Sequence, residues 1–142
     1  MSYAASLYQY ADEHNIDVDW CIMTKAASLS VPLFDGTCAI ALDPTKLCGS
    51  ADEAVKLAHE LGHCETGSFY NQYAPFDERA RHELRADRWA IHKLLPYEVL
   101  LDAFEKGYHE TWELAEYLDL TEEFIWKAIE YYTGPAGLNF AK

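Results

Sequence analysis

The sequence predicts an α+β fold in which a small β-sheet precedes two long helices and a helical C-terminal portion. Residues 16–46 are β-branched and aromatic in patches and are broken by Asp-Gly and Asp-Pro turn signals, which indicates short strands. Two long stretches with helical spacing follow, and the residues beyond 97 carry only helical patterns. Because 142 residues is the size of one ordinary domain, we expect residues 1–142 to form a single domain with 97–142 as its helical subregion.

The N-terminal half is expected to contain a helix, a sheet and a second helix. The first 13 residues have the apolar spacing of an amphipathic helix, and two or three short strands should follow, of which 38–43 is the last. Ser50 and Glu53 form a Ser-x-x-Glu capping box, which predicts the start of the next helix. Gly67 can take the left-handed conformation that ends a helix, so this helix is predicted to run up to it.

The C-terminal half is predicted to be helical. A long helix should begin near Asp77 and stop before Pro96, since proline cannot continue a helix. Shorter helices are expected at about 97–106, 109–118 and 121–132. Their apolar side chains are expected to pack the fold, and those we assign to the interior are Leu114, Leu118, Phe124, Trp126 and Ile129.

The charge of the chain argues against two classes of direct partner. The formal net charge is −13 at pH 7, whereas binding to nucleic acid or to an anionic membrane needs a basic surface. Residues 114–132 have the rhythm of a helix-turn-helix, but 97–133 carries ten acidic side chains against Lys106 and Lys127, a net charge of −8. We therefore expect no direct contact with nucleic acid and favour a basic protein as the partner.

The sequence also predicts a location away from membranes. Its longest apolar runs are far shorter than the span of about 20 residues that a bilayer requires. The N-terminal residues have neither the basic nor the apolar region of a secretory signal. We expect a soluble, cytoplasmic protein with no membrane partner.

The segment His59-Glu60-Leu61-Gly62-His63 carries the strongest functional signal. Residues four apart on a helix lie about 40° apart around its axis, so the two histidines can bind one zinc ion. Glu60 would stand beside that ion, where a general base can take a proton from water and deliver it to a leaving amine. Gly62 is unfavourable inside a helix by about 1 kcal/mol, which predicts the close approach of a strand or a facing helix. The histidine spacing arises by chance in about 2 to 3% of shuffled sequences, so a third ligand is needed to decide the interpretation.

The third ligand is expected from the second long helix. A metzincin would have glycine at 66 and histidine at 69, but this chain has Thr66 and Phe69 there. Glu83 and Asp87 share one stripe of the second helix, so Glu83 can bind the metal while Asp87 accepts a hydrogen bond from a ligand imidazole. His82 and Asp87 itself remain open as alternative third ligands.

The four cysteines, Cys21, Cys38, Cys48 and Cys64, form no Cys-x-x-Cys pair. We therefore expect free, mostly buried thiols rather than a zinc ribbon or a redox motif. Cys64 directly follows the second histidine of the motif, and a role as metal ligand or redox switch is the less favoured alternative to packing.

These residues carry a resemblance to known metallopeptidases. The order His-Glu-x-x-His, then Glu83-x-x-x-Asp87 twenty residues later, is similar to the gluzincin arrangement. The segments "LAHELGH" and "ELRADRWAIHKLLP" resemble the ImmA/IrrE family of zinc metallopeptidases, over roughly residues 16–96. The resemblance implies a zincin-like fold with two zinc-bearing helices and one catalytic zinc ion, held by His59, His63 and Glu83. It also implies that Glu60 is the general base and that the substrate is a helix-turn-helix repressor of phage or mobile-element type.

The motif and the resemblance together predict a zinc-dependent endopeptidase that cuts a protein substrate. The alternative is a binding module, in which the zincin fold regulates a repressor or a toxin by docking without proteolysis.

Two expectations concern the surroundings of the site. Residues 38–42 are the expected edge strand for main-chain pairing with a substrate, and the unranked candidates to stabilise the oxyanion are Tyr70, Tyr73 and His109.

Overall fold

The computed structural model describes residues 2–71 and 73–140, and this part of the chain forms a three-stranded sheet and six α-helices. The fold is therefore α+β, as predicted. The elements in chain order are α1 (Tyr3–Glu13), β1 (Ile16–Trp20), β2 (Ser28–Pro32), β3 (Cys38–Leu42), the 3-10 turn η1 (Pro44–Lys46), α2 (Gly49–Thr66), α3 (Phe76–Leu94), α4 (Tyr97–Glu105), α5 (Thr111–Leu118) and α6 (Glu122–Thr133).

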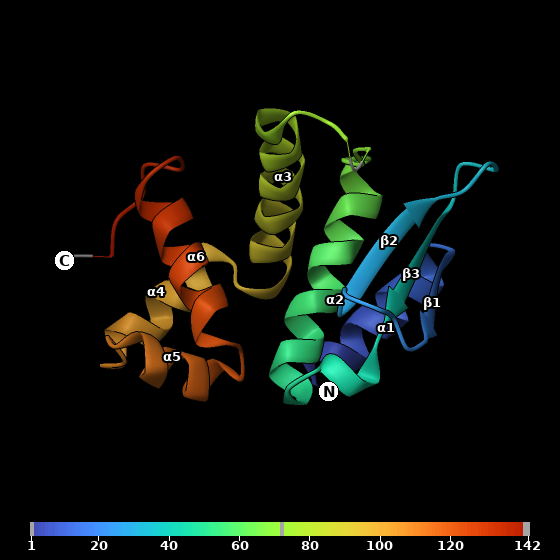
Figure 1. Ribbon diagram of the computed structural model, residues 1–142. Helices are drawn as coiled ribbons and strands as arrows, with labels where there is room; N and C mark the ends of the chain where they lie inside the picture. The colour runs from blue at the N-terminus through green and yellow to red at the C-terminus, as the bar shows by residue number, and fades with distance from the viewer. Residues whose placement is uncertain (1, 72, 141–142) are drawn as a thin grey trace.

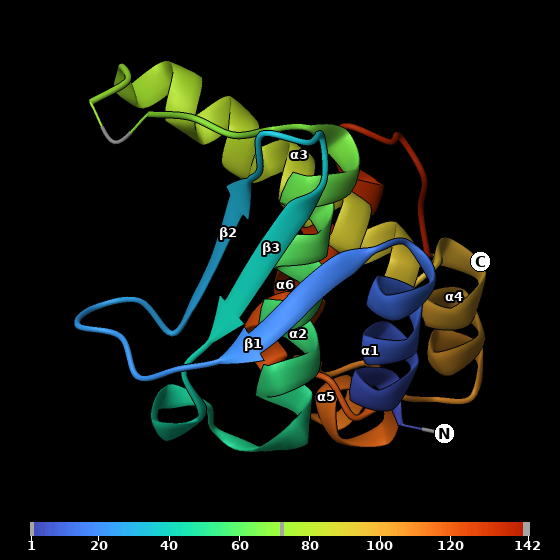
Figure 2. The same cartoon turned by 90° about the vertical axis from the view of Figure 1, so that its right-hand side faces the viewer.

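The sheet has the strand order β1-β3-β2, with β1 parallel and β2 antiparallel to β3. Helix α2 lies behind the sheet in Figure 2, with α1 next to β1. Burial alternates along β3, where Cys38, Ile40 and Leu42 face the helices. The prediction that 38–42 is an edge strand is wrong, because β2 pairs with β3 on the side away from β1. The strand beside the motif helix that lies at an edge is β2.

Helix α2 has the predicted end but not the predicted start. Gly67 has φ +64° and ends the helix, as predicted. The helix begins at Gly49, however, with Cys48 as its N-cap residue, so the prediction of a capping box at Ser50 is wrong. The Cys48 side chain makes no capping hydrogen bond, and the Cys48 N–H donates to Asp52 at 2.9 Å. Glu53 accepts a hydrogen bond from the Tyr8 hydroxyl of α1 at 2.5 Å. This glutamate therefore joins α1 to α2 instead of reaching back to the start of its own helix.

Helices α2 and α3 lie side by side in the middle of the molecule, between the sheet and the C-terminal helices (Figure 1). A Cβ atom built on Gly62 would be 2.5 Å from the carbonyl oxygen of Ala86 and 2.9 Å from its Cα atom. No real side chain tolerates such distances, so only glycine permits this approach. The prediction that another backbone lies close to Gly62 is confirmed, and that backbone belongs to α3.

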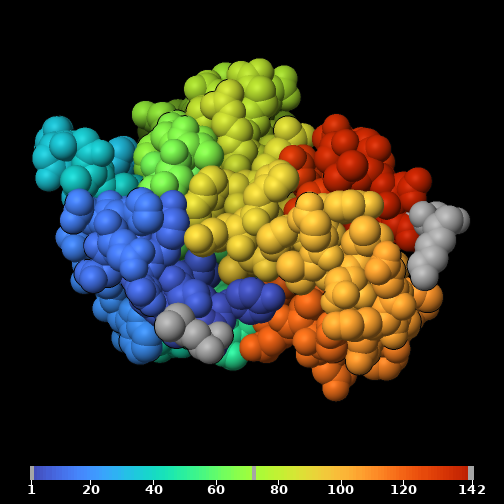
Figure 3. All heavy atoms as spheres, turned by 180° about the vertical axis from the view of Figure 1, so that it is seen from behind, coloured from blue at the N-terminus to red at the C-terminus, as the bar shows by residue number. Residues whose placement is uncertain are grey.

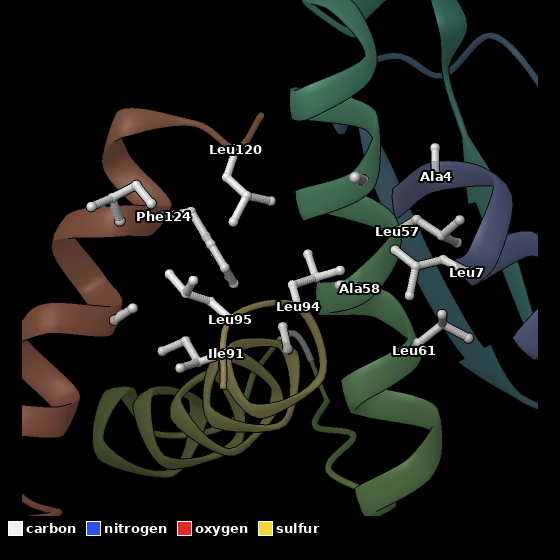
Figure 4. Close-up of a cluster of buried hydrophobic side chains, with 14 of the residues drawn as sticks. Ala4, Leu7, Leu57, Ala58, Leu61, Ile91, Leu94, Leu95, Leu120 and Phe124 are labelled. Carbon is white, nitrogen blue, oxygen red and sulfur yellow. The ribbon is translucent and has the colours of Figure 1, made fainter. Parts of the chain in front are cut away.

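A continuous apolar core connects all six helices with the sheet. In Figure 4, Leu57 and Leu61 of α2 point toward Leu7 of α1, while Leu94 extends the cluster toward the C-terminal helices. Seen from behind, α3 lies between the N-terminal and C-terminal parts of the chain (Figure 3). The core therefore holds α2 and α3 against each other from both sides.

The C-terminal helices lie within two residues of their predicted bounds. Leu114 and Phe124 are buried as predicted, but Trp126 is 56% exposed, so its assignment to the interior is wrong. Its neighbour Ile125 is fully buried, and adjacent residues on a helix point about 100° apart, which turns Trp126 outward. Within the described residues, no helix is both long and apolar enough to cross a membrane.

The turn after β3 is held by a buried carboxylate. Asp43 is 0% exposed and accepts hydrogen bonds from the Met23 N–H at 2.9 Å and the Lys46 ammonium at 2.7 Å. It also accepts from the Thr45 N–H at 2.9 Å and the Thr45 hydroxyl at 2.6 Å. These hydrogen bonds, with that from Lys46 the largest cause, hold the pKa of Asp43 well below its ordinary range.

Candidate active site

The predicted motif lies in the second half of α2, where the helix packs against both α3 and β2. His59 and His63 project from one face, with ring centroids 4.8 Å apart. Glu60 is 6% exposed, and His63 is equally buried. Buried polar side chains need hydrogen-bond partners, so the neighbours of these three residues decide what the site can do.

Helix α3 brings Glu83 to the two histidines. One ligand atom from each of His59, His63 and Glu83 can be chosen so that all lie within 4.8 Å of one another. The Nε2 atoms of the histidines are 3.2 Å apart, and Glu83 oxygens lie 2.8 Å from the Nε2 atom of His59 and 3.2 Å from that of His63. Ligands bound tetrahedrally to zinc at about 2.0 to 2.1 Å are roughly 3.3 Å apart. Two imidazoles and a carboxylate at these separations fit one zinc ion.

The second nitrogen of each imidazole has its own acceptor. The Nδ1 atom of His59 lies 2.8 Å from a carboxylate oxygen of Asp87, and that of His63 lies 2.6 Å from the Ser68 carbonyl oxygen. A carbonyl can only accept, so His63 carries a proton on Nδ1 and directs Nε2 at the group. Asp87 thus contacts the outer nitrogen of His59 and is not one of the three converging side chains.

The carboxylates determine the protonation of the histidines without a metal. Burial lowers the pKa of His59, but hydrogen bonds to Asp87 and Glu83 outweigh it and raise the pKa to about 10. Burial also opposes the protonation of His63, whose pKa is nevertheless raised, chiefly by Glu83 and the Ser68 carbonyl. Hydrogen bonds from His59 and His63 hold the pKa of Glu83 well below its ordinary value. Without a bound metal, a cationic His59 beside the Glu83 carboxylate is therefore favoured.

Glu60 points toward the sheet and is held by the edge strand. The Ser28 hydroxyl donates to one carboxylate oxygen and the Ser30 hydroxyl donates to the other, each at 2.7 Å. Both serines are on β2, whose even-numbered residues face α2 while Leu29 and Val31 are exposed on the opposite face. The Glu60 carboxylate is thus fixed beside the two histidines.

Two open cavities meet at the His-His-Glu group. One, of about 440 Å³, is lined by β2 residues and by Glu60, His63 and Tyr70. The other, of about 450 Å³, lies toward α6 and has Val55, Ala90 and Phe124 among its apolar walls. Ser28, His59 and Glu83 line both cavities. An extended molecule that crosses the group would therefore find space on each side of it.

The structure separates the remaining sequence candidates. The Tyr70 hydroxyl donates to Glu83 at 2.6 Å, and this bond together with burial raises the Tyr70 pKa to about 12. Tyr73 is 85% exposed, and the Nε2 atom of His109 lies 3.0 Å from the carbonyl oxygen of Phe104, in the α4–α5 region. His82 stacks on the Tyr70 ring, with centroids 6.0 Å apart, and is not among the three converging side chains.

The prediction of free, mostly buried thiols is wrong. Cys38 at the start of β3 and Cys64 of α2 form a disulfide with Cα atoms 5.8 Å apart. The free cysteines, Cys21 and Cys48, are exposed rather than buried. The two partners lie 26 residues apart in the sequence, and only the packing of α2 on the sheet brings them together.

Sequence reasoning missed four residues around the site. Ser28 and Ser30 carry a weak signal, since alternate serines in a strand present two hydroxyls on one face. Ser68 contributes its main chain, which no side-chain pattern reveals. Lys127 of α6 lies 3.6 Å from the second oxygen of Asp87, and nothing in the local sequence links it to α3.

A comparison with known families agrees with this geometry. No curated protein and no solved structure matches the chain. A peptidase family described as the IrrE N-terminal-like domain matches residues 12–130, which include the sheet, both site helices and most of α6. The match covers well over half of the chain and confirms the predicted resemblance. It supports a metallopeptidase-type function, and the chain belongs to the IrrE N-terminal-like peptidase family.

Proposed function

We propose that this chain is a zinc-dependent endopeptidase in which His59, His63 and Glu83 hold one catalytic zinc ion and Glu60 is the general base. The observation that carries the proposal is the convergence of two imidazole nitrogens and a carboxylate from two helices, at separations that suit tetrahedral zinc. The hydrogen bonds from His59 to Asp87 and from His63 to the Ser68 carbonyl support it, because zinc-binding histidines commonly donate their other N–H in this way.

A zinc ion bound to this group would polarise a peptide carbonyl and lower the pKa of water toward 7. Glu60 then accepts the proton as the water attacks and delivers it to the amine of the leaving peptide. Its position on the helix next to His59 keeps the carboxylate beside the three ligands instead of among them. Ser28 and Ser30 occupy one lone pair on each oxygen and leave further acceptor capacity for that proton.

Tyr70 is the candidate best placed to stabilise the oxyanion. It lines the same cavity as Glu60, and its hydroxyl is already within hydrogen-bond distance of the His-His-Glu group. We assign it as the donor to the carbonyl oxygen that gains negative charge during attack. Tyr73 and His109 lack any such contact with the group.

The edge strand β2 offers a main chain for an extended substrate. The Leu33 N–H donates to the Thr37 carbonyl, and the pairing of β2 with β3 continues in register from there. Because main-chain groups alternate in an antiparallel pair, those of Ser28 and Ser30 face the free edge. A substrate strand that pairs there would cross the cavities on either side of the group.

For the substrate we propose a helix-turn-helix transcriptional repressor. The net charge of −13, with a net of −8 over 97–133, complements the basic surface of a DNA-binding protein and repels nucleic acid itself. Charge complementarity would raise the rate of encounter with such a substrate, and added salt should reduce it.

The experiment that tests the metal site is metal analysis of the purified chain. Wild type should carry one zinc ion per chain, and His59→Ala and Glu83→Ala should lose it. His82→Ala is the matched control, since this histidine lies on α3 but outside the group. Wild-type protein without zinc that also fails to bind added Zn²⁺ would contradict the site.

The experiment that tests catalysis is coexpression with the helix-turn-helix repressor encoded nearest to this gene. Wild type should cut it, whereas Glu60→Gln should retain zinc and slow the cut by about 10²- to 10⁴-fold. Equal cutting by both forms would refute the role of Glu60. Loss of repression without any cut, in both forms, would favour docking without proteolysis.

A further inference from the structure

The Glu60 carboxylate is clamped between two side chains of one strand. Ser28 and Ser30 are two residues apart on β2, so their Cβ atoms project from the same face about 6 to 7 Å apart. Each hydroxyl approaches a different oxygen of Glu60, and both distances are 2.7 Å. The carboxylate is thus bound from opposite sides by donors that belong to a separate element of the fold.

This arrangement does more than satisfy a buried charge. A glutamate on a helix can rotate about three side-chain torsions, and one hydrogen bond would leave its carboxylate free to turn. Two donors on different oxygens fix the plane of the carboxylate, since any turn about its last bond breaks at least one contact. The alternation of β2 adds to this, because it places Ser28 and Ser30 on the face toward α2 and the exposed Leu29 on the other face.

The same two serines also lie where a substrate would pair. Their side chains contact Glu60, and their main-chain groups face the free edge of the sheet. Any displacement of β2 therefore moves the base and the main chain of the edge strand together. Ser28 in addition lines both cavities that meet at the His-His-Glu group.

We propose that Ser28 and Ser30 are positioning residues for the base, and that β2 couples the placement of the substrate to the placement of the Glu60 carboxylate. This inference rests on the proposed function, because it assumes that Glu60 is the base. Neither serine transfers a proton or contacts the metal ligands through its hydroxyl. Their effect is to hold one acceptor at a fixed position beside the ligands.

The first test uses acetohydroxamic acid, a small metal-binding probe whose N–H and O–H groups can donate to a base carboxylate. Its binding to Co²⁺-loaded protein is followed by the visible absorption of the cobalt ion. Ser28→Ala/Ser30→Ala should bind the probe about 10-fold more weakly than wild type, with Co²⁺ affinity unchanged, because the carboxylate loses its fixed orientation. Ser28→Thr/Ser30→Thr is the matched control, since threonine keeps both hydroxyls and suits a strand. This control should bind the probe like wild type.

The second test needs no metal. In thermal unfolding of the metal-free protein, Ser30→Ala should lower the melting temperature by about 4 °C in wild type and by clearly less in a Glu60→Ala background. If Ser28→Ala/Ser30→Ala does not fold, the single variants Ser28→Ala and Ser30→Ala replace it in the probe-binding test. Equal losses in both backgrounds would show that the serine does not act through Glu60.

The outcomes distinguish a failure of the positioning role from a failure of the proposed function. Wild-type probe binding by the double alanine variant, combined with weak binding by Glu60→Gln, would overturn the positioning role and leave the proposed function intact. Wild-type probe binding by Glu60→Gln would remove the base and the positioning role together. A loss of Co²⁺ affinity in the double alanine variant would mean that the serines support the fold of the metal site rather than the base.

Discussion

Asp43 and Glu60 are both buried carboxylates, but the molecule surrounds them differently. Asp43 accepts four hydrogen bonds, two from main-chain N–H groups and one from a lysine, and its donors lie in η1 and in the loop between β1 and β2. Glu60 accepts from two hydroxyls of a neighbouring strand and faces an open cavity. A carboxylate with all its acceptor capacity occupied stabilises structure, whereas one that keeps part of that capacity beside a metal group remains available for chemistry.

The largest expected effect that separates the two sites is on stability. Asp43→Asn replaces one acceptor oxygen by an NH₂ group that faces donors, so it should lower the melting temperature by several degrees. Glu60→Gln keeps one acceptor, and a serine hydroxyl can accept from its new NH₂ group, so it should shift the melting temperature by no more than about 2 °C. Thermal unfolding followed by circular dichroism measures both, in metal-free protein at pH 7. Similar losses in the two variants would erase the distinction between structural and reactive carboxylate.

The pH dependence of stability should sharpen the same comparison. The pKa of Asp43 in the folded protein is lowered below its ordinary value of 3.8, so the ionised form contributes stability that is fully present above about pH 4. That contribution is lost as the pH falls from about 4 toward the folded-state pKa. Asp43→Asn has no such group, so the difference in melting temperature between it and wild type should shrink on acidification from pH 7 to 3. A constant difference over this range would contradict the role of the ionised carboxylate.

The contact of Gly62 with Ala86 is the next test, because it sets the distance between the helices that carry the ligands. Gly62→Ala should destabilise the fold by about 1 to 3 kcal/mol, since the helices must move apart to accept a Cβ atom 2.5 Å from a carbonyl oxygen. It should also weaken zinc binding. Gly67→Ala is the matched control at the end of the same helix, where the strain is only in φ and no atom lies within 4 Å. It should lower stability by about 1 kcal/mol and leave zinc affinity unchanged.

The parts that local sequence could predict are those whose physics is local. The i, i+4 spacing on α2, the stripe on α3 and the C-cap at Gly67 each depend on one helix, and the structure reproduces these arrangements. The edge of the sheet and the disulfide could not be deduced, because both depend on strand order and on long-range packing. The prediction of a capping box was wrong for the same reason, because Glu53 accepts a hydrogen bond from Tyr8 of another helix.

The candidate site shows the same division. Its two histidines and the carboxylates Glu60, Glu83 and Asp87 stand out in sequence because charged groups in an apolar helical pattern need an explanation. The residues that hold them are harder to find: Ser28, Ser30 and Lys127 come from other elements, and Ser68 acts through its carbonyl. Residues with distinctive chemistry can thus be identified from sequence, whereas the residues that orient them can be identified only from the folded structure.

Of the four predictions in this comparison, the effect of Tyr70→Phe should be the smallest. It tests how far the reactive region extends beyond Glu60. Removal of one hydroxyl donor to a developing oxyanion should lower kcat by about 10-fold while KM changes little, because the hydrogen bond strengthens only as charge forms. Stability should stay near that of wild type, since Tyr70 is outside the apolar core and its hydroxyl contacts only Glu83 among the site residues. Tyr73→Phe is the matched control, because its ring is exposed. Retained kcat combined with weaker zinc binding would instead make Tyr70 a support for Glu83, and the reactive region would then end at the Glu60 carboxylate.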